Sequence, residues 1–208
     1  MGSFCGWTGK GLAPDTSRQA IDSMLAGDGK AAHAKSESRC DTIGGLAICE
    51  GLYATSFLEQ DGIRAALVGS PQWDDKKLAD MAAHLGSAAS LIRAYRDFGT
   101  NLLSRLHGPF ALAIQDGNEA LVAIDRLGIH RLSYAFQDGV FVFSTSTGSV
   151  VRHPQITRKV DPQAIFNYYK TAITEMRERF PETTIVNVTV PIETAPIGVM
   201  SVLKEKIK

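Results

Sequence analysis

The residues best suited to chemistry in this 208-residue chain are three cysteines, Cys5, Cys40 and Cys49, together with five histidines. The cysteines form no Cys-x-x-Cys pair, and their odd number does not suggest a disulfide framework. The histidines show no metal-binding spacing, and none has a cysteine or carboxylate neighbour in the sequence that would complete a ligand set. We therefore expect no metal ion, no other cofactor, and a reducing, cytoplasmic setting.

The composition points to a soluble chain that binds a small ligand. With 44% hydrophobic and 21% charged residues, the chain is large enough for one well-buried core and small for two. Its 22 basic and 22 acidic residues balance, so nothing favours nucleic acid or an acidic membrane as a partner. No apolar stretch approaches the roughly 18 residues of a membrane span, and no signal peptide is evident.

The elements that must position a site are predicted from periodicity and turn signals. Strands are predicted over residues 4–7, 45–49, 51–56, 65–69, 110–115, 120–125, 132–137 and 140–144. Helices are predicted over residues 17–26, 76–85, 88–98 and 162–177, and Asp15 or Thr16 is expected to cap the first. We expect a loop over residues 30–41, a meander formed by the last four strands, a β-rich tail over 183–190 and a basic segment over 203–208.

The order of these elements predicts the fold class. Helices flank the strands in clusters and do not alternate with them, which favours an α+β fold over a doubly wound parallel sheet. Asp61-Gly62, Asp116-Gly117 and Asp138-Gly139 mark tight hairpins, because Gly and Asp tolerate the positive φ that such turns need. Two packed antiparallel sheets flanked by helices, in a four-layer αββα sandwich, suit this pattern.

Residues 106–116 (LHGPFALAIQD) and 125–134 (DRLGIHRLSY) closely resemble the second half of the glutaminase domain of asparagine synthetases. That family carries Leu-x-Gly-x-Phe-Ala, then Asp-Arg-x-Gly, a Leu-Tyr-Tyr-like strand, Phe-x-Ser and His-Pro. Phe143-Ser144 and His153-Pro154 fall at the matching distances. The resemblance implies a class II, Ntn-hydrolase-like glutamine amidotransferase domain over residues 1–170, with 171–208 as a tail packed on the same domain.

The resemblance also implies a catalytic pair, Cys5 and Gly6. Family members begin with Cys-Gly after the initiator Met; the cysteine attacks the glutamine amide, and its own α-amino group is the base. Cys5 can play this part only after residues 1–4 are removed. The ammonia would pass to an ATP-dependent synthetase domain or subunit, because no Ser-Gly-Gly-x-Asp-Ser phosphate loop occurs in these residues. Whether the chain forms a homodimer is left open.

The substrate-recognition residues depart from the family pattern. The early Arg-Leu is missing from residues 45–51, and the family's Asn-Gly-Glu is replaced by residues 69–71, where the amides of Gly69 or Ser70 could still donate to an oxyanion. Ser87 stands where the family has an Asp that pairs with the substrate ammonium. Losing several charge-assisted contacts should weaken glutamine binding by orders of magnitude.

Alternatives therefore remain open at this point. Cys5 is either the nucleophile or a buried structural cysteine, since cysteine is among the most buried residue types. The chain is accordingly a glutaminase domain, a non-catalytic scaffold or interaction domain, or an amidohydrolase for another amide. Asp125 and Arg126 are expected to form a structural pair that pins the following loop. Trp73 either lines a pocket or covers the core.

Overall fold

The computed structural model describes residues 2–9, 11–27 and 35–158, with single residues at 163, 166, 167 and 170. The chain divides into a compact unit, Met1–Thr157, and a second unit, Arg158–Lys208. The predicted helix over 162–177 is described only at the four single positions, all of them helical. The predicted tail over 183–190 and the basic segment over 203–208 lie outside the described residues, and the predicted domain boundary at residue 170 stays a prediction.

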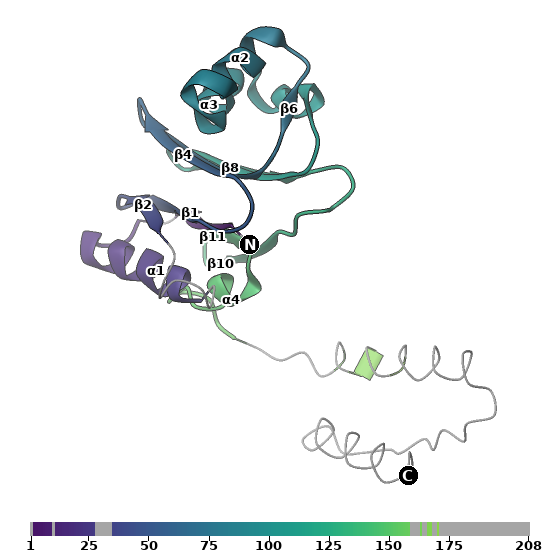
Figure 1. Ribbon diagram of the computed structural model, residues 1–208. Helices are drawn as coiled ribbons and strands as arrows, with labels where there is room; N and C mark the ends of the chain where they lie inside the picture. The colour runs from purple at the N-terminus through teal and green to yellow at the C-terminus, as the bar shows by residue number, and fades with distance from the viewer. Residues whose placement is uncertain are drawn as a thin grey trace, which may run out of the picture. The chain divides into compact units, whose positions relative to one another are not determined.

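Two antiparallel sheets form the centre of the first unit (Figure 1). Sheet A has the strand order β10-β11-β1-β3-β2, and its strands are β10 Ser133–Gln137, β11 Val140–Ser144, β1 Ser3–Gly9, β3 Gly44–Cys49 and β2 Ser36–Cys40. Sheet B has the order β4-β5-β8-β9, and its strands are β4 Thr55–Gln60, β5 Ile63–Gly69, β8 Phe110–Asp116 and β9 Glu119–Ile124. A small ribbon pairs β6 Gln72–Trp73 with β7 Leu106–His107.

Helices cover the outer face of each sheet. Helices α2 Lys76–Leu85 and α3 Ser87–Phe98, followed by the 3₁₀ turn η1 Gly99–Arg105, share a hydrophobic core with sheet B. Helices α1 Pro14–Ala26 and α4 Thr147–Val150 share another core with sheet A. The two sheets face each other (Figure 1), and a third core of buried side chains from both sheets lies between them. The predicted four-layer αββα sandwich is therefore confirmed.

Local sequence explains why the helices of the sheet B side form where predicted. The Asp75 carboxylate caps α2 by accepting hydrogen bonds from the amides of Lys77 and Leu78. Trp73 belongs to the core of this layer, and its indole Nε1 donates to Ser90 Oγ on α3 at 3.0 Å. Trp73 therefore covers the core, which was one of its two predicted roles.

Several predicted boundaries were wrong. Strand β2 lies within the stretch predicted as a loop; it is an edge strand with mostly exposed side chains, so its polar sequence gave no strand signal. Strand β4 begins at Thr55, and most of the strand predicted over 51–56 is a turn. Helix α1 begins at Pro14 with no side-chain cap, because proline suits the first helical turn.

The last four strands do not form one meander. β8 and β9 make a hairpin in sheet B, whereas β10 and β11 make a hairpin in sheet A. The loop between β9 and β10 crosses from one sheet to the other (Figure 1). Sequence patterning identified all four strands but could not show to which sheet each hairpin belongs, because both hairpins carry the same signals.

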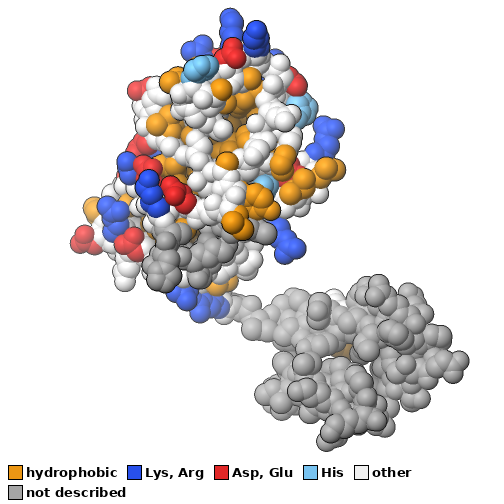
Figure 2. All heavy atoms as spheres, viewed as in Figure 1, with side chains coloured by type: hydrophobic (Ala, Val, Ile, Leu, Met, Phe, Trp, Pro, Cys, Tyr) orange, Lys and Arg blue, Asp and Glu red, His pale blue; other side chains and the backbone are white. Residues whose placement is uncertain are grey.

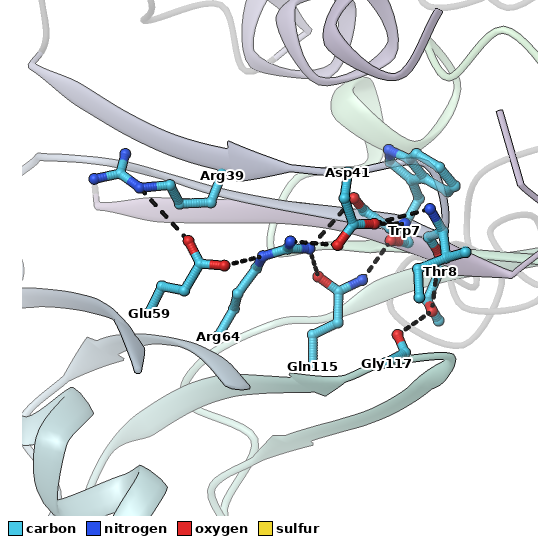
Figure 3. A network of polar contacts seen from close by, with 10 residues as sticks. Trp7, Thr8, Arg39, Asp41, Glu59, Arg64, Gln115 and Gly117 are labelled. Atoms are coloured by element: carbon cyan, nitrogen blue, oxygen red, sulfur yellow. Dashed lines mark hydrogen bonds and ion pairs between the residues drawn. The ribbon is translucent and has the colours of Figure 1, made fainter. Parts of the chain in front are cut away.

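A buried polar network ties the two sheets together (Figure 3). The Arg64 guanidinium on β5 is 7% exposed; its Nη1 donates to Gln115 Oε1 on β8 at 3.1 Å, and Nη2 pairs with Asp41. Gln115 Nε2 in turn donates to the carbonyl of Trp7 on β1 at 2.8 Å. Burial raises the pKa of Asp41, but amide hydrogen bonds and Arg64 outweigh it and hold this pKa below its ordinary value.

In the described part of the chain, none of the helices has both the length and the apolar character needed to cross a bilayer.

His153 is buried, and its uncharged imidazole ring accepts a hydrogen bond from the backbone. Its side chain is 1% exposed and lies against the ring of Trp7, with ring centroids 5.6 Å apart. The amide of Gln155 donates to His153 Nδ1 at 3.3 Å, which requires that this nitrogen carry no proton. Burial lowers the pKa of His153 to about 4. Folding therefore selects the uncharged imidazole.

We predict a loss of stability on mild acidification because of His153. An unfolded histidine has the higher pKa, so the contribution of His153 is complete above about pH 6.5 and is lost as pH falls towards 4. The free energy of unfolding, measured with urea, should be about 2 kcal/mol lower near pH 4.5 than near pH 7. His153→Gln should flatten this dependence, whereas His84→Gln, at an exposed position of α2, should preserve it. An unchanged slope in His153→Gln would contradict the assignment.

Candidate active site

The predicted nucleophile, Cys5, lies on β1, the middle strand of sheet A. It pairs with Ser144 on β11 and with Ala47 on β3. Its side chain is 2% exposed and belongs to the core beneath α1, together with Ile21 and Met24. Because successive side chains of a strand point to opposite faces, Cys5 faces the helical layer while Phe4 faces sheet B.

The residues before Cys5 are an integral part of the fold. Phe4 is 1% exposed and belongs to the core between the sheets. Its amide donates to Thr145 Oγ1 at 3.1 Å, and its carbonyl accepts from the Thr145 amide at 3.1 Å and from Ser144 Oγ at 2.8 Å. Ser3 pairs with Cys49 on β3. The nitrogen of Cys5 is thus a peptide nitrogen within a strand, and a free amine there requires that these contacts be given up.

Gly6, the second member of the predicted pair, sits where no side chain fits. A Cβ at this position would lie 2.6 Å from Cζ of Phe143 and 2.8 Å from the carbonyl oxygen of Gly45. Such distances are below van der Waals contact, so glycine is required by the packing of β1 against its neighbours. The Cys-Gly pair therefore has a steric reason in addition to the catalytic one that the resemblance implies.

The amides of Gly69 and Ser70, predicted as oxyanion donors, are already engaged. Gly69 ends β5 with φ of +113°, and its amide donates to the carbonyl of Ala54 at 2.9 Å. The amide of Ser70 donates to the carbonyl of Pro109, also at 2.9 Å. A developing oxyanion would have to displace one of these bonds or use other donors. Their role in substrate binding stays a prediction.

Ser87 and the Cys5 thiol belong to different layers. Ser87 is the first residue of α3, which packs on the outer face of sheet B. Its carbonyl accepts a hydrogen bond from Ser90 Oγ at 2.9 Å, and the adjacent amide of Ala88 donates to Ser56 Oγ at 2.9 Å. The Cys5 thiol faces the outer core of sheet A. The described structure therefore does not bring these two predicted site residues together.

At the amino end of β1 the structure places Tyr53 and His130, which the sequence did not single out as site residues, beside Gly2 and Gly69. A Cβ on Gly2 would lie 3.2 Å from the carbonyl oxygen of Tyr53, and one on Gly69 would lie 2.9 Å from Nε2 of His130. The rings of Tyr53 and His130 meet edge to face with centroids 5.1 Å apart. His130 lies two residues beyond the Asp-Arg-x-Gly motif at residues 125–128, and this position was its only sequence signal, because its partners come from remote segments.

Asp125 organises the loop that carries His130. Its buried carboxylate accepts hydrogen bonds from the amides of Leu127, Ile129 and His130, each at 3.1 Å. Burial raises the pKa of Asp125, but these amide hydrogen bonds outweigh it and keep this pKa below its ordinary value. Asp125 pins the loop as predicted, although it does so through backbone amides and forms no ion pair with Arg126 in the described structure.

No group of metal-binding side chains occurs among the residues that the structure describes.

Comparison with known proteins identifies the family. A model of the glutamine amidotransferase domain matches residues 82–191, which is more than half of the chain. The chain belongs to this family of glutamine amidotransferase domains. The match extends beyond residue 170 into the predicted tail, and it begins after Cys5, so it identifies the family without testing the nucleophile. It does not single out the asparagine synthetase type.

Two solved structures are among those that match this chain. One is a glutamine phosphoribosylpyrophosphate amidotransferase from B. subtilis complexed with ADP and GMP, with a TM-score of 0.49 and 17% identity, over 77% of this chain and 45% of that one. The other is an allosteric regulatory enzyme of purine biosynthesis, with a TM-score of 0.47 and 17% identity, over 72% of this chain and 42% of that one. This chain thus spans less than half the length of either. No curated protein matches.

We predict that Phe4 contributes strongly to stability. Replacing Phe4 by Ala would leave a cavity between the sheets and should lower the free energy of unfolding by about 3 to 4 kcal/mol. Phe136→Ala, at a side chain that is 73% exposed, is the matched control and should change the free energy far less. Urea unfolding of both variants measures the difference. Equal effects would show that the segment before Cys5 is not anchored as described.

Proposed function

We propose that this chain is the glutaminase domain of an ATP-dependent synthetase of the asparagine synthetase type, with Cys5 as nucleophile once residues 1–4 have been removed. The proposal is supported by one observation: a chain of the glutamine amidotransferase family carries Cys5 and Gly6 on the central strand of its αββα sandwich. The ammonia acceptor would be a synthetase domain or subunit, either joined to this chain or separate from it.

The proposed nucleophilic attack and its proton transfers use the thiol and the α-amino group of a processed Cys5. Its α-amino group takes the thiol proton, and the thiolate attacks the amide carbon of glutamine. The amine then gives this proton to the departing ammonia, and water hydrolyses the thioester to release glutamate. Removal of residues 1–4 would also remove Phe4 from the core between the sheets. On the side of sheet B, this core contains the small side chains of Ala66, Ala111 and Ala113.

Binding of the glutamine carboxylate requires a cation that replaces the missing family arginine. Arg64 is buried, but it is already paired with Asp41 and Glu59 and is held by Gln115. It lies near the start of β5, whereas Gly69, beside Tyr53 and His130, lies at the end of that strand. Arg64 is therefore committed to the contact between the sheets and does not serve as the replacement.

A second candidate, a non-catalytic scaffold or interaction domain, is favoured by a different observation. Phe4 and the strand around it are fully built into the fold, and the amides of Gly69 and Ser70 are paired within the backbone. With residues 2–4 in place, Cys5 has neither a free amine nor an exposed thiol. In this form the standard nucleophile mechanism cannot operate.

Exposing the amine of Cys5 separates the two candidates. Intact mass and N-terminal peptide mapping of the purified protein show whether residues 1–4 are present. A protease site placed directly before Cys5 gives the processed chain, and ammonia release from glutamine is then measured. We expect activity only in the processed chain, and none after Cys5→Ala in that background. Cys49→Ala, at another buried cysteine of sheet A, is the matched control and should retain activity.

The other outcomes are also informative. A processed chain that is folded but has an unreactive thiol and releases no ammonia would establish the scaffold. A processed chain whose Cys5 is alkylated rapidly, but which leaves glutamine intact, would indicate an amidohydrolase that acts on another amide.

A further inference from the structure

Two loops near the amino end of β1 present apolar side chains to solvent. Leu127 is 83% exposed and Ile129 is 57% exposed in the loop after β9, while Leu52 is 91% exposed and Tyr53 is 40% exposed in the turn before β4. The ring contact between Tyr53 and His130 joins the two loops. We call these four side chains the apolar rim. Figure 2 shows exposed hydrophobic side chains at several places on one face.

Backbone hydrogen bonds hold the loop that carries Leu127 and Ile129 of the apolar rim. Three amides of the loop donate to the Asp125 carboxylate, and the amide of Gly128 donates to the Asp125 carbonyl at 3.0 Å. Gly128 adopts φ of +64°, a conformation that favours glycine. Leu127 and Ile129 therefore point outwards from a loop whose shape is fixed by a buried carboxylate. A partner that binds this loop would have little backbone entropy to overcome.

Two exposed arginines flank the part of the rim that follows β9. Arg126 and Arg131 flank Leu127 and Ile129, are exposed, and form no ion pair within the described ranges. Four other arginines pair with carboxylates, namely Arg39, Arg64, Arg93 and Arg96, whereas Arg18, Arg105 and Arg152 form no ion pair with another described residue. An unpaired arginine beside an exposed apolar side chain is typical of binding surfaces, where arginine is enriched.

We propose that the apolar rim is a docking surface for a polypeptide segment that carries apolar side chains flanked by carboxylates. Apolar contacts with Leu52, Tyr53, Leu127 and Ile129 would supply the affinity. Carboxylates placed opposite Arg126 and Arg131 would supply the specificity. This inference goes beyond the proposed function and does not depend on glutaminase activity.

Charge argues against a second copy of this chain as the occupant. In a symmetric dimer the same patch meets itself, so the arginines at the two ends of one loop would approach those of the other. Like charges brought together at an interface cost several kcal/mol and are a common means of excluding a wrong partner. A segment with acidic side chains meets no such penalty.

Synthetic peptides test the proposal on the full chain. Three sets of peptides, each about 15 residues long, share the same leucine spacing. The residues between the leucines are glutamate in the first set, lysine in the second and serine in the third. Fluorescence anisotropy measures the binding of each set to the chain. We expect the glutamate set to bind at least about tenfold more tightly than the lysine set. The double variant Leu127→Ser with Ile129→Ser should lose this binding, and Arg126→Glu with Arg131→Glu should transfer the preference to the lysine set.

Leu85→Ser provides the matched control, because Leu85 is 70% exposed at the end of α2 and lies outside the rim. Urea unfolding confirms that each variant is folded before binding is measured. The proposal is overturned if no set binds, if the glutamate and lysine sets bind equally, or if Leu85→Ser has the same effect as the rim variant. Self-association that is lost on Leu127→Ser, measured by sedimentation, would identify a second copy as the occupant instead.

Discussion

Strand β1 is paired along both edges and buried on both faces, and the rest of the molecule is arranged around it. β3 and β11 pair with the two edges of β1, α1 covers one of its faces, and sheet B covers the other. The hydrogen bond from the Gln115 side chain to the Trp7 carbonyl links β1 to sheet B. Every residue from Ser3 to Thr8 is buried, so no change at Cys5 or before it is local in its effect.

The burial and pairing of β1 bear directly on whether Cys5 can act as a nucleophile. A family member that uses its terminal cysteine needs the amine of that residue and the reacting atoms of its substrate in one accessible place. Here two strand residues, Ser3 and Phe4, precede Cys5, and Phe4 fills space between the sheets. Fold and family therefore do not by themselves establish activity in this chain. The fold requires that β1 be present, whereas activity requires that Cys5 be the first residue of that strand.

Much of the fold could be predicted, because helices α2 and α3 and the strands of the Asp-Gly hairpins carry strong periodic or turn signals. Strand β2 could not, because an edge strand with exposed side chains has no apolar alternation. The catalytic pair was proposed from the Cys-Gly motif, but burial of Cys5 against α1 depends on strand direction and packing. The grouping of Tyr53, Gly69 and His130 arises from tertiary contacts between segments that are far apart in the sequence.

The pairing of β1 with β11 also has a consequence for folding during synthesis. Cys5 lies opposite Ser144, so the central strand of sheet A obtains its second neighbour only after almost the whole first unit has been made. Contacts of such long sequence separation slow folding, because a large loop must close before they form. Until then, β1 has an open edge with apolar side chains on both faces, the kind of segment that pairs with other chains. A ribosome-bound or truncated chain that ends before β11 would therefore depend on chaperones to remain in solution.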